Sequence, residues 1–315
     1  MHDKKIRGGQ IQWISSLRGL LVFFVFFSHL KIPIDSDILF IFGRIGVVGF
    51  FLISGYLAVT SVARRNVKQF YVNRFFRIYP MYWLLLLMFF AMSEKYSKID
   101  FFYNMTLFEE FLGHEAMIGS SWMLPIMVIF FLFLPYVSRS RVRIETTWWL
   151  FCVGCLLVAI LRYMTGLPFP TALCLLINVG LLGFIDKQAE RKEILFKGGI
   201  YEVLLFLCVL LSYQNRAVYY FIAYNLGFIT YYIFKHVNIH IQVLDILGKQ
   251  GFTFFLGASI PMKIMMKLFP SIADSYWYYY VVIQFFLTFI FSYVLTQYCE
   301  RPLLAWGKKI ETKCN

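Results

Sequence analysis

Long apolar segments recur along the whole chain of 315 residues, and each has about the length that a helix needs to cross most of a bilayer. Sixty per cent of the residues are apolar, 15% are charged and the mean hydropathy is +0.68, which is far from the composition of a soluble domain. We therefore predict an all-α, polytopic integral membrane protein with about ten transmembrane helices. The predicted spans are 11–30, 38–62, 78–93, 120–137, 146–162, 170–185, 198–212, 217–234, 251–269 and 276–299.

The basic residues are distributed unevenly between the segments that connect these spans. If the N-terminus is cytoplasmic, 21 of the 30 Lys and Arg residues fall in cytoplasmic segments and nine fall elsewhere. This asymmetry is the positive-inside pattern, and it predicts that both termini are cytoplasmic. Because topology accounts for the formal net charge of +13, we predict no nucleic-acid partner.

We expect a single membrane-embedded domain over residues 1–315, because no segment has the composition of a soluble domain or of a linker. The basic N-terminus and the apolar run after it resemble a signal peptide. However, Arg18 interrupts the apolar run and no small-residue cleavage site follows, so we expect the segment to be retained. The acidic and aromatic outer segment 93–119 is either a sugar-contacting surface or an ordinary solvated loop.

Arg18 and His29 lie inside the first apolar segment. Placing a charged residue in the middle of a membrane-spanning helix costs roughly 2.5–3.5 kcal/mol of insertion free energy. Such residues therefore usually face the protein interior or a water-filled cavity. Eleven residues make about three helical turns, which puts both side chains on one face about 16 Å apart. An imidazole at that position can act as a general base towards a hydroxyl. The alternative is a structural histidine bonded to a neighbouring helix.

Arg74 and Arg77 are three residues apart and, on a helix, project together from the inner membrane face. Paired guanidinium groups suit an anionic, phosphate-rich partner from the cytosol. Anchoring to anionic lipid headgroups is the alternative.

Three other positions carry polar groups or small residues in the apolar context. Arg44 lies near the outer end of the second span, where it either snorkels to the surface or orients an acceptor. Gly46 and Gly49, in the same span, favour close helix packing. Near the end of the chain, Glu300 either pairs with Arg301 at the interface or belongs to a polar site at the inner face.

Five motifs, in order along nearly the whole chain, resemble signatures of the acyltransferase-3 family of integral membrane O-acyltransferases. They are Leu17-Arg18-Gly19 followed by His29; Gly46-Val47-Val48-Gly49-Phe50-Phe51-Leu52-Ile53-Ser54-Gly55-Tyr56; Arg74-x-x-Arg77-Ile78-Tyr79-Pro80; Trp122-Met123-Leu124 with Pro135; and Glu300-Arg301-Pro302. The chain resembles the stand-alone type, without a fused SGNH domain.

The resemblance implies transfer of an acetyl group from cytoplasmic acetyl-CoA to a hydroxyl of an extracytoplasmic glycan, such as O-antigen, capsule or exopolysaccharide. It implies catalytic roles for His29 and Arg18 and binding of the donor by Arg74 and Arg77, and the alternative for Arg18 is that it joins these two arginines in holding the donor phosphates. Substrate-contacting or structural roles fall to Arg44, Trp122 and Glu300. It further implies a multi-pass protein of the bacterial inner membrane, with the lipid bilayer, an acyl-CoA and a glycan as partners and no metal. No oligomeric state is predicted.

Two departures from the family pattern keep other functions open. Met127 stands where the family often has Glu, and the segment from Gly251 to Ala258 lacks the Tyr and His of a late family motif. A relative that has lost activity and acts as an assembly partner is therefore one alternative. The other is a transporter of a lipid-linked sugar or small amphiphile, although the paired halves with broken helices typical of transporters are not seen.

Overall fold

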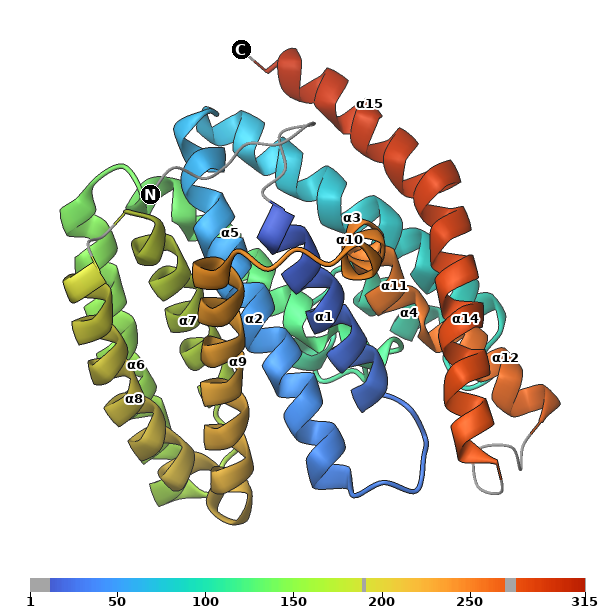
Figure 1. Ribbon diagram of the computed structural model, residues 1–315, viewed down its shortest axis with the longest axis horizontal. Helices are drawn as coiled ribbons and strands as arrows, with labels where there is room; N and C mark the ends of the chain where they lie inside the picture. Colours follow the sequence, from blue (N-terminus) through green and yellow to red (C-terminus); the bar gives the residue numbers. More distant parts are fainter. Residues whose placement is uncertain (1–11, 189–190, 270–275, 315) are drawn as a thin grey trace.

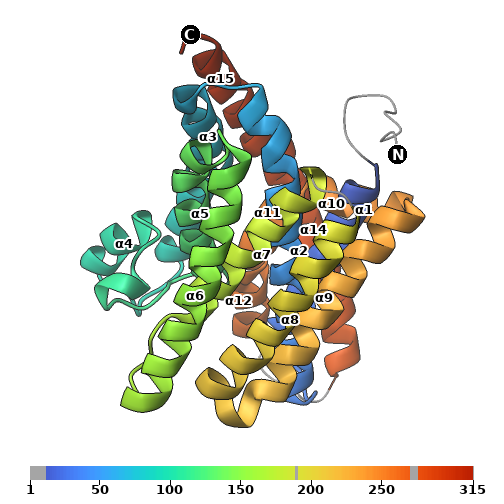
Figure 2. The same ribbon diagram turned by 90° about the vertical axis from the view of Figure 1, so that its left-hand side faces the viewer.

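The computed structural model describes residues 12–188, 191–269 and 276–314, and within these ranges the chain is helical, without strands (Figure 1). Long helices lie side by side in one bundle, and α4 (Lys98–Met105) stands out from its flank in the turned view (Figure 2). The prediction of an all-α protein is thus confirmed for the described residues.

Within the described ranges, seven helical stretches are long and apolar enough to cross a membrane, and the predicted number of ten is not confirmed. One stretch, Lys192–Val237, reverses direction at η3 (Gln214–Arg216), so that α8 and α9 lie next to each other (Figure 1). The shorter apolar helix α1 (Gln12–Ser28) lies in the middle of the bundle. The other elements of these stretches are α2 (Ser36–Ala63), α3 (Val67–Ala91), η2 (Gly119–Trp122), α5 (Met123–Val137), α6 (Arg141–Thr165), α7 (Thr171–Gln188), α8 (Arg191–Tyr213), α9 (Ala217–Val237), α14 (Trp277–Leu295), η4 (Thr296–Glu300) and α15 (Arg301–Thr312).

The predicted span 251–269 is not one helix. It is divided into α11 (Gly251–Gly257) and α12 (Ser259–Leu268), which follow the short helix α10 (Gln242–Lys249). Pro261 has no N–H to donate to the carbonyl of Gly257, four residues earlier, so an uninterrupted helix would lose a hydrogen bond at this point. Gly257 adds to the break because glycine has a low helix propensity.

Glycines bring the central helices into close contact. A Cβ atom added to Gly55 would lie 1.8 Å from the carbonyl oxygen of Gly180, and one added to Gly46 would lie 2.3 Å from the Val25 side chain. Helices α1, α2 and α7 therefore touch where no larger residue fits, as the small residues of the second span predicted. A Cβ on Gly19 would lie 2.0 Å from the Leu244 carbonyl oxygen, which places α10 directly against α1.

Helix α3 begins well before the predicted span 78–93. Asn66 and Gln69 form a capping box, in which each side chain bonds to the backbone N–H of the other residue. Because this cap starts the helix at Val67, Arg74 and Arg77 lie on a regular helix and project together from it.

The acidic and aromatic segment between α3 and α5 is folded against α3. Tyr82 Oη donates to the Asn104 carbonyl at 2.9 Å and Trp83 Nε1 donates to the Met105 carbonyl at 2.9 Å. Asn104, which is 0% exposed, accepts a hydrogen bond from the Met117 N–H at 2.8 Å. The segment is therefore an ordered unit that includes α4 and η1 (Glu110–Leu112), and not simply a solvated loop.

This unit buries a carboxyl group whose titration predicts a pH-dependent stability. Glu109 is 2% exposed, and burial raises its pKa from 4.5 to about 7. Between pH 4.5 and about pH 7, Glu109 therefore keeps its proton in the folded protein and has lost it in the unfolded chain. Stability should therefore fall by up to about 3 kcal/mol as the pH rises from 4.5 through 7 and change no further above that.

A Glu109→Gln variant should remove most of this pH dependence, because an amide does not ionise. Thermal unfolding of the purified protein in nanodiscs at pH 5 and pH 8 measures the effect. The wild type should lose Tm between these values and the variant should lose less. Equal losses in the two proteins would contradict the assignment.

Candidate active site

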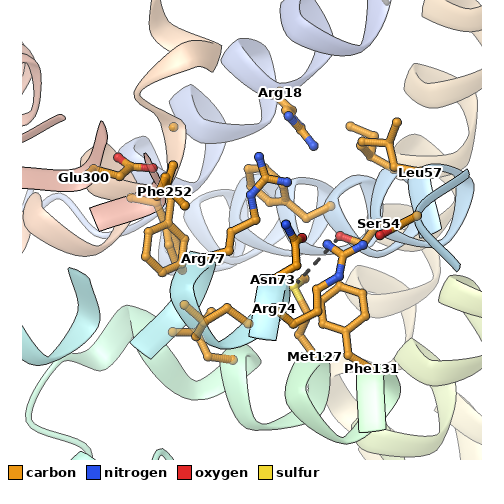
Figure 3. A pocket seen from close by; sticks show the side chains of 18 of the residues that line it. Arg18, Ser54, Leu57, Asn73, Arg74, Arg77, Met127, Phe131, Phe252 and Glu300 are labelled. Carbon is orange, nitrogen blue, oxygen red and sulfur yellow. Dashed lines mark hydrogen bonds between the residues drawn. The ribbon is translucent and has the colours of Figure 1, made fainter. Parts of the chain in front are cut away.

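A cavity of about 560 Å³ opens between α1, α2, α3, α5, α11 and α15, at the end of the bundle where α2 and α15 finish. We call it the inner cavity, and Figure 3 shows several of the side chains that line it. Seven cations and two carboxylates face it: Arg18, Arg64, Arg65, Arg74, Arg77, Lys249 and Lys308, with Glu300 and Glu311. This excess of positive charge, within one concave space, makes the cavity suited to an anionic ligand.

The structure brings together Arg18, Arg74 and Arg77, which the sequence places in two distant segments (Figure 3). Arg77 is exposed to the space of the inner cavity, which it lines. The Arg74 guanidinium lies over the rings of Phe131 and Phe70, at 4.3 and 5.0 Å from their centroids, and its Nε is buried with no hydrogen-bond partner in the described structure.

Helix α15 closes one side of the inner cavity. Arg65 Nε lies 2.6 Å from Glu311 Oε1, and Asn73 Nδ2 donates to Glu311 Oε2 at 2.8 Å. Glu311 thus neutralises one cation at the rim and fixes α15 to α2 and α3. No ion pair of the described residues engages Arg18, Arg74 or Arg77, so their charges are available to a ligand.

Glu300 also lies in the inner cavity. It ends the π-helical turn η4, and its Oε2 accepts from Thr253 Oγ1 at 2.5 Å and from Thr296 Oγ1 at 3.2 Å. Arg301 instead donates to Gln297. Of the two interpretations of Glu300, the structure therefore favours the polar site at the inner face over a pair with Arg301. A π-helical turn inside a longer helix is frequent at functional sites.

A second cavity, of about 170 Å³, lies at the other end of α1, and we call it the outer cavity. It contains His29, one residue beyond the end of α1, together with Arg44 and Trp122. The remaining lining residues are Val25, Ser28, Phe40, Gly43, Val47 and Phe255. Three further predicted site residues are thus brought together, but separately from the arginines of the inner cavity.

A hydrogen bond orients the His29 ring. Nδ1 lies 2.8 Å from the carbonyl oxygen of Val25. Because a carbonyl can only accept, this contact assigns the proton of the neutral imidazole to Nδ1 and leaves the lone pair on Nε2. His29 therefore has the tautomer that a general base or a nucleophile acting through Nε2 requires.

The inner and outer cavities share one lining residue, Phe255. Its ring is buried, and the ring of Phe50, which also lines the inner cavity, lies 6.4 Å away between centroids. Sequence reasoning did not identify Phe255, because nothing distinguishes it from the other 35 of the 36 Phe residues. Asn73 and Glu311 were also missed, since each matters only through the packing of α15 on α3.

The donor set of the inner cavity fits the phosphates of a coenzyme A thioester, because guanidinium groups form charge-assisted and often bidentate hydrogen bonds with phosphate oxygens. Within the described ranges, no three His, Cys, Asp or Glu side chains are grouped so that they could hold a metal ion.

Comparison with known proteins identifies the family. The chain matches the family model Acyl_transf_3, described as an acyltransferase domain, over residues 11–297. No curated protein and no solved structure matches. The match covers most of the chain, including every predicted site residue except Glu300. This membrane protein therefore belongs to the acyltransferase-3 family.

Proposed function

We propose that this protein transfers an acetyl group from cytoplasmic acetyl-CoA to a hydroxyl of an extracytoplasmic glycan, such as O-antigen, capsule or exopolysaccharide. It would do so in the bacterial inner membrane, with both termini in the cytoplasm. The observation that carries the proposal is the pair of cavities that meet at Phe255, one rich in arginine and the other containing His29. A donor and an acceptor that approach from opposite sides require such an arrangement.

On the donor side, Arg18, Arg74 and Arg77 hold the phosphates of the donor. None of these three guanidinium groups forms an ion pair with a carboxylate of the described residues. An uncompensated cationic cavity also attracts a multiply charged anion from solution and increases its rate of association.

On the acceptor side, His29 acts through Nε2. As a general base it takes the proton of the acceptor hydroxyl while the hydroxyl oxygen attacks the acyl carbon and the carbon–sulfur bond breaks. As a nucleophile it would first accept the acyl group itself and then pass it to the hydroxyl. Both routes need an unprotonated Nε2, and the bond from Nδ1 to Val25 supports either.

Comparison of cells with and without the gene tests the function. O-acetyl groups on the envelope glycans are quantified by mass spectrometry, and the glycans themselves are quantified in parallel. An acetyltransferase leaves the same glycans without acetyl groups when it is deleted. Loss of a whole glycan from the surface with unchanged acetylation of what remains would instead indicate a transporter and overturn the proposal.

The shared residue Phe255 provides a separate prediction. If the acyl group passes between Phe50 and Phe255, a Phe255→Trp variant should narrow the passage and lower O-acetylation about tenfold or more, because buried sites tolerate added volume poorly. Binding of acetyl-CoA in the inner cavity should change little. Phe291, which lines neither cavity, provides the matched control as Phe291→Trp. Equal O-acetylation in the two variants would contradict the passage.

A further inference from the structure

Arg44 has an unusual environment for a cation in the outer half of a membrane protein. Its guanidinium carbon lies 4.1 Å from the centroid of Trp122, 5.0 Å from that of Phe40 and 5.2 Å from that of Tyr220. No carboxylate forms an ion pair with it in the part of the chain that the structure describes, and Asp37, on the same helix, pairs with Arg216 at 3.6 Å. Aromatic faces thus stabilise the charge of Arg44 without neutralising it.

The donors of this guanidinium are only partly used. Nη2 lies 3.5 Å from the hydroxyl oxygen of Tyr220, while Nη1 is buried and has no partner among the described residues. A buried donor without a partner costs roughly 1–3 kcal/mol, and more when it is charged. An oxygen atom in the outer cavity, from a ligand or from the water that a ligand displaces, would recover this cost.

A column of stacked groups holds Arg44 in place. The Tyr220 ring stacks on Tyr213 at 3.7 Å between centroids and 11° between planes, and Arg162 lies over Tyr213 at 5.2 Å. Of the three aromatic rings around the Arg44 guanidinium, that of Trp122 lies nearest to it. The guanidinium is therefore oriented before any ligand arrives, which is the condition under which a fixed donor stabilises a transition state.

Arg44 and His29 line the same cavity of about 170 Å³. On this measure a single water molecule needs about 10–15 Å³, so the cavity has room for a reacting acyl group and an acceptor hydroxyl. A carbonyl group bound there would lie in a cavity that both side chains line. One would remove a proton from the attacking hydroxyl and the other would face the carbonyl oxygen.

We propose that Arg44 is a catalytic residue that donates hydrogen bonds to the carbonyl oxygen of the acyl group during transfer. This role rests on the proposed function. The hydroxyl oxygen of the acceptor attacks the acyl carbon, its proton goes to His29, and the carbonyl oxygen takes the negative charge beside Arg44. When the carbonyl re-forms, the carbon–sulfur bond breaks and the thiolate of coenzyme A leaves and regains the proton. The products are the ester and free coenzyme A.

The test compares Arg44→Ala and Arg44→Lys with the matched control Arg216→Ala. Arg216 is a guanidinium that also lies over Phe40, at 5.7 Å, but it does not line the outer cavity. We expect Arg44→Ala to lower glycan O-acetylation in cells by a hundredfold or more, the loss typical of removing one such donor. Arg44→Lys should restore part of it, and Arg216→Ala should stay within about twofold of wild type.

Two measurements on the purified protein in nanodiscs complete the test. Affinity for acetyl-CoA should be unchanged in Arg44→Ala, whereas damage to the fold would lower it. Hydrolysis of acetyl-CoA, with water as a neutral acceptor, should fall with O-acetylation. Unchanged hydrolysis would mean that Arg44 binds an anionic group of the acceptor and would overturn the proposed role.

If Arg44→Ala acetylates normally while His29→Ala does not, the inference about Arg44 fails alone. If His29→Ala also acetylates normally, the proposed role of His29 fails as well, and if deletion of the gene leaves O-acetylation unchanged, the proposed function itself fails.

Discussion

A His29→Ala variant should lose glycan O-acetylation by a factor of about 10² to 10⁴, the range that a positioned acid–base group supplies. The loss is expected because Nδ1 is engaged by the Val25 carbonyl and Nε2 is the free nitrogen at the outer cavity. Among the described residues no other histidine lines either cavity, so none of their imidazoles can take over the proton. The measurement is the amount of base-released acetate per unit of purified glycan, at equal amounts of protein in the membrane.

His236→Ala is the matched control for this variant. His236 is an exposed residue near the end of α9, and it lines neither cavity. Its substitution should leave O-acetylation unchanged. If His29→Ala acetylates at the wild-type rate, His29 is neither base nor acyl carrier and the proposed mechanism is wrong. Binding of acetyl-CoA to His29→Ala should be retained, because the proposed site for the donor phosphates is the inner cavity.

The double variant Arg74→Ala/Arg77→Ala should bind acetyl-CoA about a hundredfold more weakly or worse. A hydrogen bond to a charged group contributes roughly 1.5–3 kcal/mol, so the loss of two amounts to about 3 kcal/mol or more, and each 1.4 kcal/mol is a factor of ten. Isothermal titration of acetyl-CoA into the protein in nanodiscs measures the change. Arg139→Ala/Arg143→Ala is the control, since it removes two exposed cations that line neither cavity.

Stability separates ligand binding from a structural role for these arginines. The described structure pairs neither Arg74 nor Arg77 with a carboxylate, and both lie near Arg18 and Arg65 in the inner cavity. Glu300 in the same cavity attracts Arg77, while Arg65 repels both arginines, so the two effects oppose each other and the ligand-free variant should be about as stable as the wild type. Acetyl-CoA at a hundredfold excess over its Kd should stabilise the wild type by about 2.7 kcal/mol and the variant far less. A variant that loses Tm without ligand yet binds acetyl-CoA normally would refute the donor-binding role.

The helices were largely predictable because the bilayer imposes a length and a composition on every span. The apolar stretches at α2, α6 and α7 fall close to the predicted bounds. The span at 251–269 failed because hydropathy does not register the missing N–H of Pro261, which divides the stretch into α11 and α12. Helix α3 was predicted too short, because its first turns are polar and their start is marked by the Asn66 cap instead of by apolar residues.

The candidate site was predictable wherever a charged group interrupts an apolar stretch. Arg18, His29 and Arg44 are conspicuous for this reason, whereas Arg74 and Arg77 stand out by their three-residue spacing in a basic segment, and all five line one of the two cavities. Phe255, by contrast, is an apolar residue among apolar residues. Only its position between the cavities distinguishes it, and that position depends on how the broken helix packs.

The sequence by itself determined the class of the protein, its family motifs and which costly polar groups it retains in an apolar environment, because each is a property of local composition and spacing. The tertiary structure decided which of those polar groups line the inner cavity and which line the outer cavity. Close packing at glycines such as Gly19 and Gly55 brings α10 and α7 against the central helices, and α15 packs across α3. These contacts between distant segments gather the arginines at one end of α1 and place Arg44 and Trp122 beside His29 at the other. Contacts of this kind depend on side-chain shape at long range along the chain, which no local pattern records.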